Sequence, residues 1–379
     1  MAASKTIEVP HLGGIKVGYA LSGDRYDASK PTCVLINSMC TTVSLYREQF
    51  NDPNLTNALN LLAIEPLGHG ATSSVSEQFT YWDSAIMALQ VMDKLGIQKA
   101  FALGTSQGGW IIVRMALLAP DRILGLLPLG TSMDSESPES RAKGCWDPAP
   151  IIKPFIEKWT SATPTPDFVI DDVWQGMVAS LGFSGAVSAE TVEFWKATVR
   201  DVYKGDEGRK KVRMAAINLL ERDGLLLRLG DIKCPVYWLQ VRKSFLYHSI
   251  RKLVANNEQG TEDAPYGLTY PPEQIKLFTS SKETKFITVQ GGAHYLNATS
   301  PKEVADALLE MVTNRHEEVD LGGQNNAEPI IDRGLFISIE GGEYYVRIHT
   351  YNLDVRAEIP VWDMKWNSGG VIILTYLDK

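Results

Sequence analysis

One segment near residue 100 constrains the fold more than any other part of the chain. The short apolar run Lys99–Leu103 predicts a buried strand, and Gln107–Ala119, which ends at Pro120, predicts a helix. A glycine-rich turn with a serine near its centre joins them: Gly104-Thr105-Ser106-Gln107-Gly108-Gly109. So tight a turn forces the serine into a strained backbone conformation and requires neighbours without side chains. The order strand, turn, helix predicts an α/β fold in which Ser106 lies at the carboxyl edge of a mostly parallel sheet.

Strand-like and helix-like segments alternate through the first two thirds of the chain, as in a parallel sheet covered by helices. We expect strands over 7–10, 15–21, 33–37, 61–65, 123–129, 235–239 and 285–289, and further helices over 81–95 and 301–313. Ser300 is the expected N-cap of the last helix.

The pattern of strand-like and helix-like segments changes at three points, which suggests four parts. Residues 1–135 and 232–316 are expected to build the two parts of the core. Residues 136–231 are rich in aromatic side chains and helical spacing with proline breaks, and we interpret them as an inserted helical lid. Residues 317–379 predict a small β-rich tail, with a hairpin around Gly341-Gly342 and strands over 355–361 and 371–376.

A serine hydroxyl is a poor nucleophile until a base takes its proton, so a histidine is expected near Ser106. His294 lies in Gly291-Gly292-Ala293-His294, between a predicted strand and the last helix, and therefore at the same edge of the sheet. His69 lies in a Gly-His-Gly turn and is expected to be structural, while the remaining histidines lack such a setting. The sequence thus predicts Ser106 as nucleophile and His294 as base.

Charge and cysteine content limit the partners. A net charge of −8 argues against a nucleic-acid surface. The four cysteines form no metal-type or redox-type spacing, which is typical of free thiols in a reducing compartment. No secretory signal or membrane-length apolar run is visible, so we expect a cytoplasmic protein. A peroxisomal location is the alternative, although the chain ends in Leu-Asp-Lys rather than a Ser-Lys-Leu type address.

From about residue 6 to residue 316 the chain resembles the α/β-hydrolase superfamily. Besides the serine turn and the late histidine, Glu65-Pro66-Leu67-Gly68-His69-Gly70-Ala71-Thr72-Ser73 is similar to that family's D-x-R-G-x-G-x-S turn, with Glu in place of Asp. Asn37-Ser38-Met39-Cys40-Thr41-Thr42 stands where the family usually has His-Gly, and resembles a segment of 3-oxoadipate enol-lactonases. The resemblance implies an oxyanion hole formed by the backbone N–H groups of Gln107 and Met39.

Two further stretches, Gly104–Trp110 and Gly130–Asp134, resemble fungal α/β-hydrolases encoded in polyketide and host-selective toxin gene clusters. This second resemblance implies a role in secondary metabolism, for example with a polyketide or fatty-acyl substrate. The aromatic-rich segment 136–231 independently suggests a small apolar substrate. The expected Ser/His mechanism requires no metal and no organic cofactor.

The acid of the expected Ser-Asp-His triad is harder to place. The family has it in a G-x-x-D turn directly after the strand that ends here at Gln240, where this chain has a basic, unpatterned stretch. Gly260-Thr261-Glu262-Asp263 matches the turn instead, so Asp263 is the predicted acid. Asp134, after the preceding strand, is the alternative because some members carry their acid there.

Residues 241–259 interrupt the expected strand and acid turn. Removing them would join Leu239-Gln240 directly to Gly260-Thr261-Glu262-Asp263. One hypothesis is a translated, retained intron, since Val can begin with GT and Gln259 can be encoded by CAG; the other is an ordinary loop insertion. In either case we expect the segment to be dispensable, because it is basic and has little apolar periodicity.

These residues predict a serine hydrolase that cleaves an ester, lactone or thioester of a small apolar molecule. Two alternatives remain at this point. The same fold hosts non-hydrolytic chemistry with Ser and His, and the chain could also be an inactive scaffold that only binds. A carboxylate nucleophile is disfavoured because the turn carries Ser106.

Overall fold

The computed structural model describes residues 4–23, 25–143, 145–183, 187–241 and 270–316, with four short strands between 335 and 373. The chain divides into two compact units, Met1–Ala327 and Glu328–Lys379. None of the helices in the described ranges combines the length and the apolar character that crossing a lipid bilayer requires.

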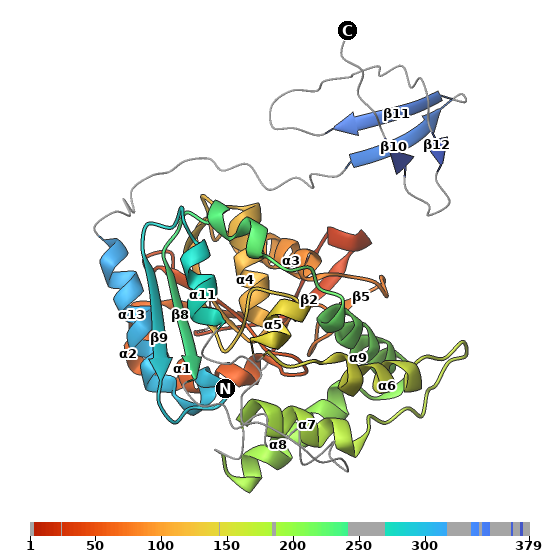
Figure 1. Cartoon of the computed structure of the whole chain (residues 1–379), viewed down its shortest axis with the longest axis horizontal. Helices are drawn as coiled ribbons and strands as arrows, with labels where there is room; N and C mark the ends of the chain where they lie inside the picture. Colours follow the sequence, from red (N-terminus) through yellow and green to blue (C-terminus); the bar gives the residue numbers. More distant parts are fainter. Residues whose placement is uncertain are drawn as a thin grey trace. The chain divides into compact units, whose positions relative to one another are not determined.

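A central sheet organises the first unit (Figure 1). Among the described residues it holds nine strands, in the order β1-β2-β4-β3-β6-β7-β8-β9, with β5 paired to β2. Their bounds are Lys5–Val9, Ile15–Leu21, Thr32–Ile36, Asn60–Ile64, Ser73–Ser74, Ala100–Thr105, Ile123–Leu129, Val236–Val241 and Thr284–Val289 for β1 to β9. Strand β2 pairs antiparallel with β1, β4 and β5. In the remaining spatial order β4-β3-β6-β7-β8-β9, every pair of neighbours is parallel.

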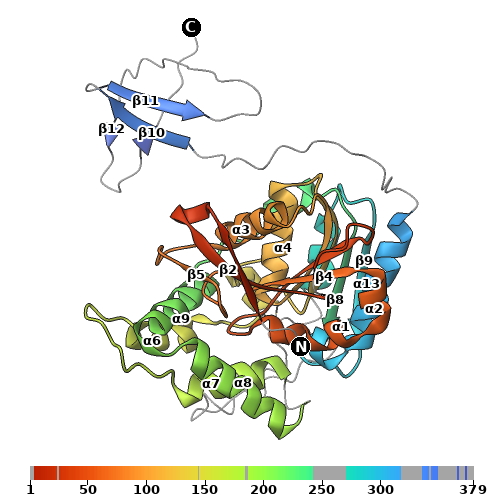
Figure 2. The ribbon, with the colours of Figure 1, turned by 180° about the vertical axis from the view of Figure 1, so that it is seen from behind.

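Helices cover both faces of this sheet, which explains why its central strands are continuous apolar runs. Every residue of β3, β6 and β8 is buried. One face carries α3 (Tyr81–Lys94) and α4 (Gln107–Leu118), and the other carries α1 (Arg47–Asn51), α2 (Pro53–Ala58) and α13 (Pro301–His316), as Figures 1 and 2 show. The short helices α11 (Pro271–Gln274) and α12 (Leu296–Thr299) precede β9 and α13 respectively.

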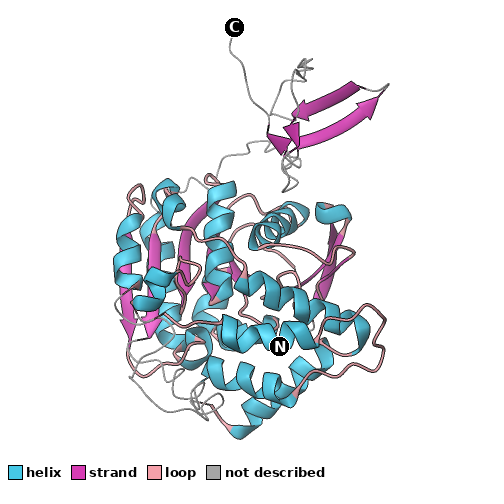
Figure 3. Cartoon of the chain, turned by 45° about the vertical axis from the view of Figure 1, so that its right-hand side comes forward, coloured by secondary structure: helices cyan, strands magenta, loops and turns pink. Residues whose placement is uncertain are grey.

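Five helices lie between β7 and β8 in the chain. They are α5 (Pro138–Ala142), α6 (Ala149–Lys158), α7 (Asp172–Phe183), α8 (Ala189–Val202) and α9 (Gly205–Leu220). The last four gather beyond the end of the sheet toward which β8 and β9 point (Figures 1 and 3). They therefore stand over the carboxyl edge, where the serine turn was expected. That they act as a movable lid stays a prediction.

The second unit is described only by its strands. Strands β10 (Leu335–Glu340) and β11 (Glu343–Ile348) pair antiparallel and form the predicted hairpin. A further pair, β12 (Lys365–Trp366) and β13 (Ile372–Ile373), includes part of the strand expected over 371–376. The strand expected over 355–361 lies outside the described residues.

The sequence prediction of a mostly parallel sheet flanked by helices is confirmed. It differs from the structure at short elements without a clear periodicity, such as β5, α1 and α2, which were not predicted. The boundary at residue 240 was also wrong: Val241 belongs to β8, is buried and pairs with Val289. The first residue of the segment expected outside the sheet thus lies within β8; the insertion itself stays a prediction, because residues 242–259 lie outside the described part.

Candidate active site

The serine turn is held in a backbone conformation that few residues adopt. Ser106 has φ 55° and ψ −117°, follows β6 directly and is the N-cap of α4. A non-glycine residue at positive φ is strained and persists only where the surroundings impose it. Its backbone N–H donates to the carbonyl oxygen of Leu129 at 2.8 Å, and Gly109 N donates to the Ser106 carbonyl at 2.8 Å. The turn thus presents Ser106 at the carboxyl edge of the sheet.

The three glycines around Ser106 allow this close approach. A Cβ on Gly104 would lie 2.2 Å from the carbonyl carbon of Gly108, and one on Gly108 would lie 2.1 Å from the carbonyl oxygen of Ile36. A Cβ on Gly109 would lie 2.6 Å from the Thr131 side chain. The spacing of glycines predicted from the sequence is therefore a steric requirement of the turn.

His294 lies on the loop between β9 and α12, next to the end of β7. A Cβ on Gly130 would lie 2.6 Å from the His294 carbonyl oxygen and 3.3 Å from its Nδ1. Gly130 has φ 54°, and the residue before it, Leu129, accepts the hydrogen bond from Ser106 N. Ser106 and His294 are therefore placed on either side of the same two residues at the end of β7.

A buried hydrogen bond joins the residue before Ser106 to the segment that follows His294. Thr105 Oγ1, next to Ser106, donates to Asn297 Oδ1 at 2.9 Å, three residues after His294. Asn297 Nδ2 donates to the Leu45 carbonyl at 2.7 Å, and Gln49 Nε2 donates to the Asn297 carbonyl at 2.7 Å. Sequence reasoning missed Asn297, because a single polar residue after a predicted histidine gives no periodic signal.

The segment expected to supply the second oxyanion donor forms a tight loop after β3. Asn37 Nδ2 donates to the Thr41 carbonyl at 2.7 Å, and the Thr41 hydroxyl donates to the Ser38 carbonyl at 2.8 Å. Met39 lies at the tip of this loop and its carbonyl accepts a long hydrogen bond from Tyr295 Oη at 3.5 Å. Tyr295 is the neighbour of His294, so the loop and the histidine are mutually positioned.

The Gln107 side chain has three polar partners, of which the Asn37 carbonyl oxygen is the most distant, 3.5 Å from Nε2. Its Nε2 lies 2.9 Å from His69 Nε2, and its Oε1 accepts a hydrogen bond from Tyr81 Oη at 3.2 Å. His69 Nδ1 lies 2.9 Å from the Leu67 carbonyl, so the proton is on Nδ1 and Nε2 is the acceptor. Burial lowers the pKa of His69 to about 4, which agrees with a neutral ring. His69 is thus a buried, neutral residue in contact with Gln107, and its purely structural role stays a prediction.

Glu65, which stands in place of the family's Asp, links two loops of the site. Its Oε2 accepts from Ala71 N at 2.7 Å, and its Oε1 accepts from Val43 N at 3.1 Å. Gly70 and Gly18 leave the room for this longer side chain, since a Cβ on either would lie about 2.2 Å or less from a Glu65 carboxyl atom. Glu65 therefore anchors the loop that follows Met39.

Of the two candidate acids, the structure describes Asp134 but not Asp263. Asp134 is buried, and its carboxylate accepts hydrogen bonds from Ser135 N at 2.8 Å, Ser137 Oγ at 2.6 Å and Tyr270 Oη at 3.1 Å. Three hydrogen bonds, two from its own loop and one from Tyr270, thus hold this carboxylate in place. Asp263 lies outside the described residues.

Aromatic side chains of α6 and α7 and of the residue after α6 pack beside the loop that follows β3. Phe155, Trp159 and Trp174 form ring pairs with centroids 4.8 to 5.5 Å apart. Cys40 belongs to the same buried cluster, and Met39 packs against it. The apolar surface beside the site thus comes largely from the helices between β7 and β8.

Comparison with protein families identifies the fold. The model of the alpha/beta hydrolase fold family matches residues 31–148. Among solved structures, an esterase from Thermogutta terrifontis has a TM-score of 0.62 at 15% identity, covering 82% of this chain and 99% of that one. The enol-lactonase from Burkholderia xenovorans LB400 has a TM-score of 0.60 at 17% identity, covering 81% and 100%. The chain has the α/β-hydrolase fold.

Curated relatives share only part of the chain and differ in activity. A putative carbamate hydrolase of Stutzerimonas stutzeri is 27% identical over 123 residues, 32% of this chain and 45% of that protein. A 2-heptyl-3-hydroxy-4-quinolone dioxygenase of Rhodococcus erythropolis is 26% identical over 141 residues, 36% of this chain and 50% of that protein. The chain thus spans about half the length of these relatives.

Proposed function

We propose that this protein is a serine hydrolase, with Ser106 as nucleophile and His294 as general base. The observation that carries the proposal is the strained conformation of Ser106, φ 55° and ψ −117°, between β6 and α4 and beside the loop that bears His294. Strain at a residue that its surroundings hold in place is typical of active sites. The α/β-hydrolase fold and the hydrolases among proteins of similar fold support the same reaction class.

In the proposed reaction Ser106 Oγ attacks a carbonyl carbon while His294 accepts the hydroxyl proton. The backbone N–H groups of Gln107 and Met39 stabilise the oxyanion, and His294 then protonates the leaving group. Water attacks the acyl-enzyme with His294 again acting as base, which releases the acid and restores Ser106. Asp263 would hold the imidazole in the correct tautomer.

The surroundings of the site support an ester, lactone or thioester of a small apolar acid as substrate. The ring cluster of Phe155, Trp159 and Trp174 packs beside Cys40 and Met39. A pocket of about 180 Å³, lined in part by Leu45, Phe183 and Trp195, lies beside Tyr295, the neighbour of His294. A polyketide or fatty-acyl substrate in fungal secondary metabolism is the narrower form of this proposal.

Labelling with a fluorophosphonate tests the nucleophile. We expect the wild type to be labelled at Ser106 and Ser106→Ala to lose both labelling and turnover of short esters. Ser84→Ala is the matched control, because Ser84 is a buried serine whose hydroxyl has no hydrogen-bond partner among the described residues. Labelling of the Ser106→Ala variant, or retention in it of more than a few per cent of the wild-type activity, would contradict the proposal.

A non-hydrolytic reaction is the second candidate, because one relative of this chain is a dioxygenase. Ser106→Ala separates the two reaction classes only together with an acyl-enzyme measurement. Rapid quenching with an activated ester should trap an acyl group on Ser106, seen as a mass increase of one acyl unit. Substrate conversion without such an adduct would favour the alternative, and absence of both labelling and conversion would favour an inactive binding scaffold.

A further inference from the structure

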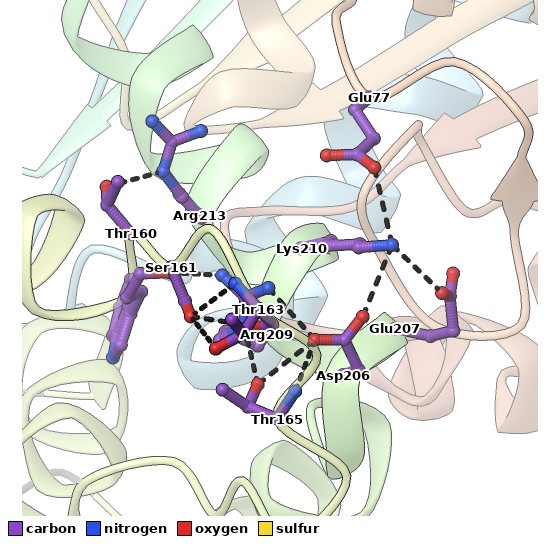
Figure 4. Close-up of polar contacts among 11 residues, drawn as sticks. Glu77, Thr160, Ser161, Thr163, Thr165, Asp206, Glu207, Arg209, Lys210 and Arg213 are labelled. Carbon is purple, nitrogen blue, oxygen red and sulfur yellow. Dashed lines mark hydrogen bonds and ion pairs between the residues drawn. The ribbon is translucent and has the colours of Figure 1, made fainter.

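A pocket of about 390 Å³ is lined by none of the residues placed in the candidate active site, and Figure 4 shows the polar contacts around it. It is bounded by the loop after α6, by the first half of α9 and by Glu77. Its polar lining includes Thr160, Thr163, Glu77, Asp206, Lys210 and Arg213. Its volume lies within the range of sites that hold small molecules.

The base of this pocket is rigid. Arg209 is buried, and its guanidinium donates to Thr165 Oγ1 at 2.6 Å, to the Trp159 carbonyl at 2.5 Å and to Asp206 Oδ1 at 2.9 Å. Asp206 also accepts from Thr165 N at 2.8 Å. Arg209 and Asp206 therefore neutralise one another and fix the loop to α9.

Lys210 is likewise compensated. Its Nζ lies 3.3 Å from Glu77, 3.2 Å from Asp206 and 3.4 Å from Glu207, as the dashed lines of Figure 4 show. These carboxylates raise the pKa of Lys210 through hydrogen bonds and charge, so the amine stays protonated. A ligand anion has little to gain from a cation already surrounded in this way.

Arg213 is different, because it forms no ion pair with any residue that the structure describes. Its Nε donates to Thr160 Oγ1 at 2.8 Å, and Nη1 lies 4.0 Å from Met214 Sδ. The side chain is half-buried in the pocket wall, and in Figure 4 its two terminal nitrogens carry no dashed contact. With Glu207 counted, three cations and three carboxylates meet at this pocket and their charges balance, but Arg213 itself has no carboxylate within ion-pair distance among the described residues.

We propose that this pocket binds the carboxylate group of a small organic acid through Arg213. A guanidinium edge offers two parallel N–H donors that match a carboxylate, and partial burial strengthens such a pair. The Thr163 hydroxyl, whose contact to Ser161 Oγ is long at 3.4 Å, is available as a further donor. Inorganic phosphate, which a guanidinium also binds, is the competing anion in the test below. The proposal does not depend on the proposed catalysis.

Titration calorimetry of the full chain with sodium acetate, butyrate and benzoate at constant ionic strength tests this site. We expect saturable binding that weakens at least tenfold in Arg213→Gln and less in Arg213→Lys. Arg228→Gln is the matched control, since Arg228 is an exposed arginine on η3 (Leu226–Asp231) and is paired with Asp231. The Arg228→Gln variant should bind the carboxylates with the affinity of the wild type.

Thr160→Val is a second variant, in case Arg213→Gln unfolds; it removes the oxygen that orients Arg213 and should weaken binding without removing the charge. His294→Gln shows whether the acid occupies the candidate active site instead. Absence of saturable binding, equal weakening in Arg228→Gln, loss in His294→Gln with retention in Arg213→Gln, or tighter binding of inorganic phosphate would each overturn the proposal.

Discussion

At the scale of single residues, the pKa of the proposed base His294 depends on whether the carboxylate of an acid contacts its ring. Burial lowers the pKa of His294 to about 4, so the ring is neutral and able to accept a proton over most of the pH range. A carboxylate at the ring would favour the protonated form and raise this pKa. The acid limb of the pH–rate profile therefore reports whether an acid reaches His294.

We predict that Asp263→Asn lowers kcat by about 10⁴, by analogy with other triads, and moves the acid limb of kcat/KM to lower pH. Asp134→Asn should leave the limb in place and cost far less, because the Asp134 carboxylate is engaged by Ser135, Ser137 and Tyr270. Full pH–rate profiles of both variants provide the measurement. The opposite order would assign the acid to Asp134.

His69 gives a prediction about stability rather than activity. Its pKa is about 4 in the folded protein against 6.5 for an exposed histidine, because it is buried. The unfolded chain therefore takes up the proton first, and the stabilising effect of the neutral ring is complete above pH 6.5 and is lost as pH falls toward 4. The full effect is at most about 3 kcal/mol.

Replacing His69 with Gln should therefore flatten the loss of stability between pH 6.5 and pH 4. At neutral pH the substitution should lower the free energy of unfolding by only about 1 kcal/mol, because Gln still offers an acceptor to Gln107. Urea unfolding of wild type and variant at several pH values measures the difference, in which the other titrating groups cancel. Identical pH dependence in both proteins would show that His69 does not titrate on unfolding.

At the scale of elements, helix α7 contacts the loop that bears His294 through Gly182 and Phe183. Tyr295 N donates to the Gly182 carbonyl at 2.9 Å, and a Cβ on Gly182 would lie 1.9 Å from the Tyr295 ring. That ring also packs edge-on against Phe183 with centroids 5.1 Å apart. Any side chain at Gly182 must therefore displace the neighbour of His294.

We predict that Gly182→Ala lowers kcat and reduces the free energy of unfolding by about 1–3 kcal/mol through overpacking. Gly176→Ala in the same helix is the control, because nothing lies within 4 Å of its added Cβ. This control should stabilise by about 0.5–1 kcal/mol, through the higher helix propensity of Ala, and leave kcat unchanged. Equal effects of the two substitutions on kcat would argue against a specific role for Gly182.

At the scale of the whole molecule, every residue assigned to the proposed reaction lies in the first compact unit, Met1–Ala327. We predict that a chain ending at Ala327 keeps the kcat/KM of the full chain within about twofold and unfolds at the same temperature. Parallel ester assays and thermal unfolding of both chains test this. A large loss of activity or stability would show that residues 328–379 support the fold or the site.

The sequence by itself predicted the α/β fold and the positions of Ser106 and His294 along it. Both follow from local rules: the glycines of the turn prevent steric clashes among near neighbours, and buried parallel strands are continuous apolar runs. The carboxyl ends of parallel strands meet at one edge, so residues that follow different strands were expected to lie together there.

The tertiary structure alone identified the side chains that position these residues. Asn297 lies 192 residues from Thr105, and His69 lies 38 residues from Gln107, yet each pair is hydrogen-bonded. The same holds for Arg213, whose partner Thr160 is 53 residues away and which has no ion pair with the residues that the structure describes. Such contacts join single polar residues from separate elements, so no local periodicity encodes them, and only packing of the sheet and its helices brings them together.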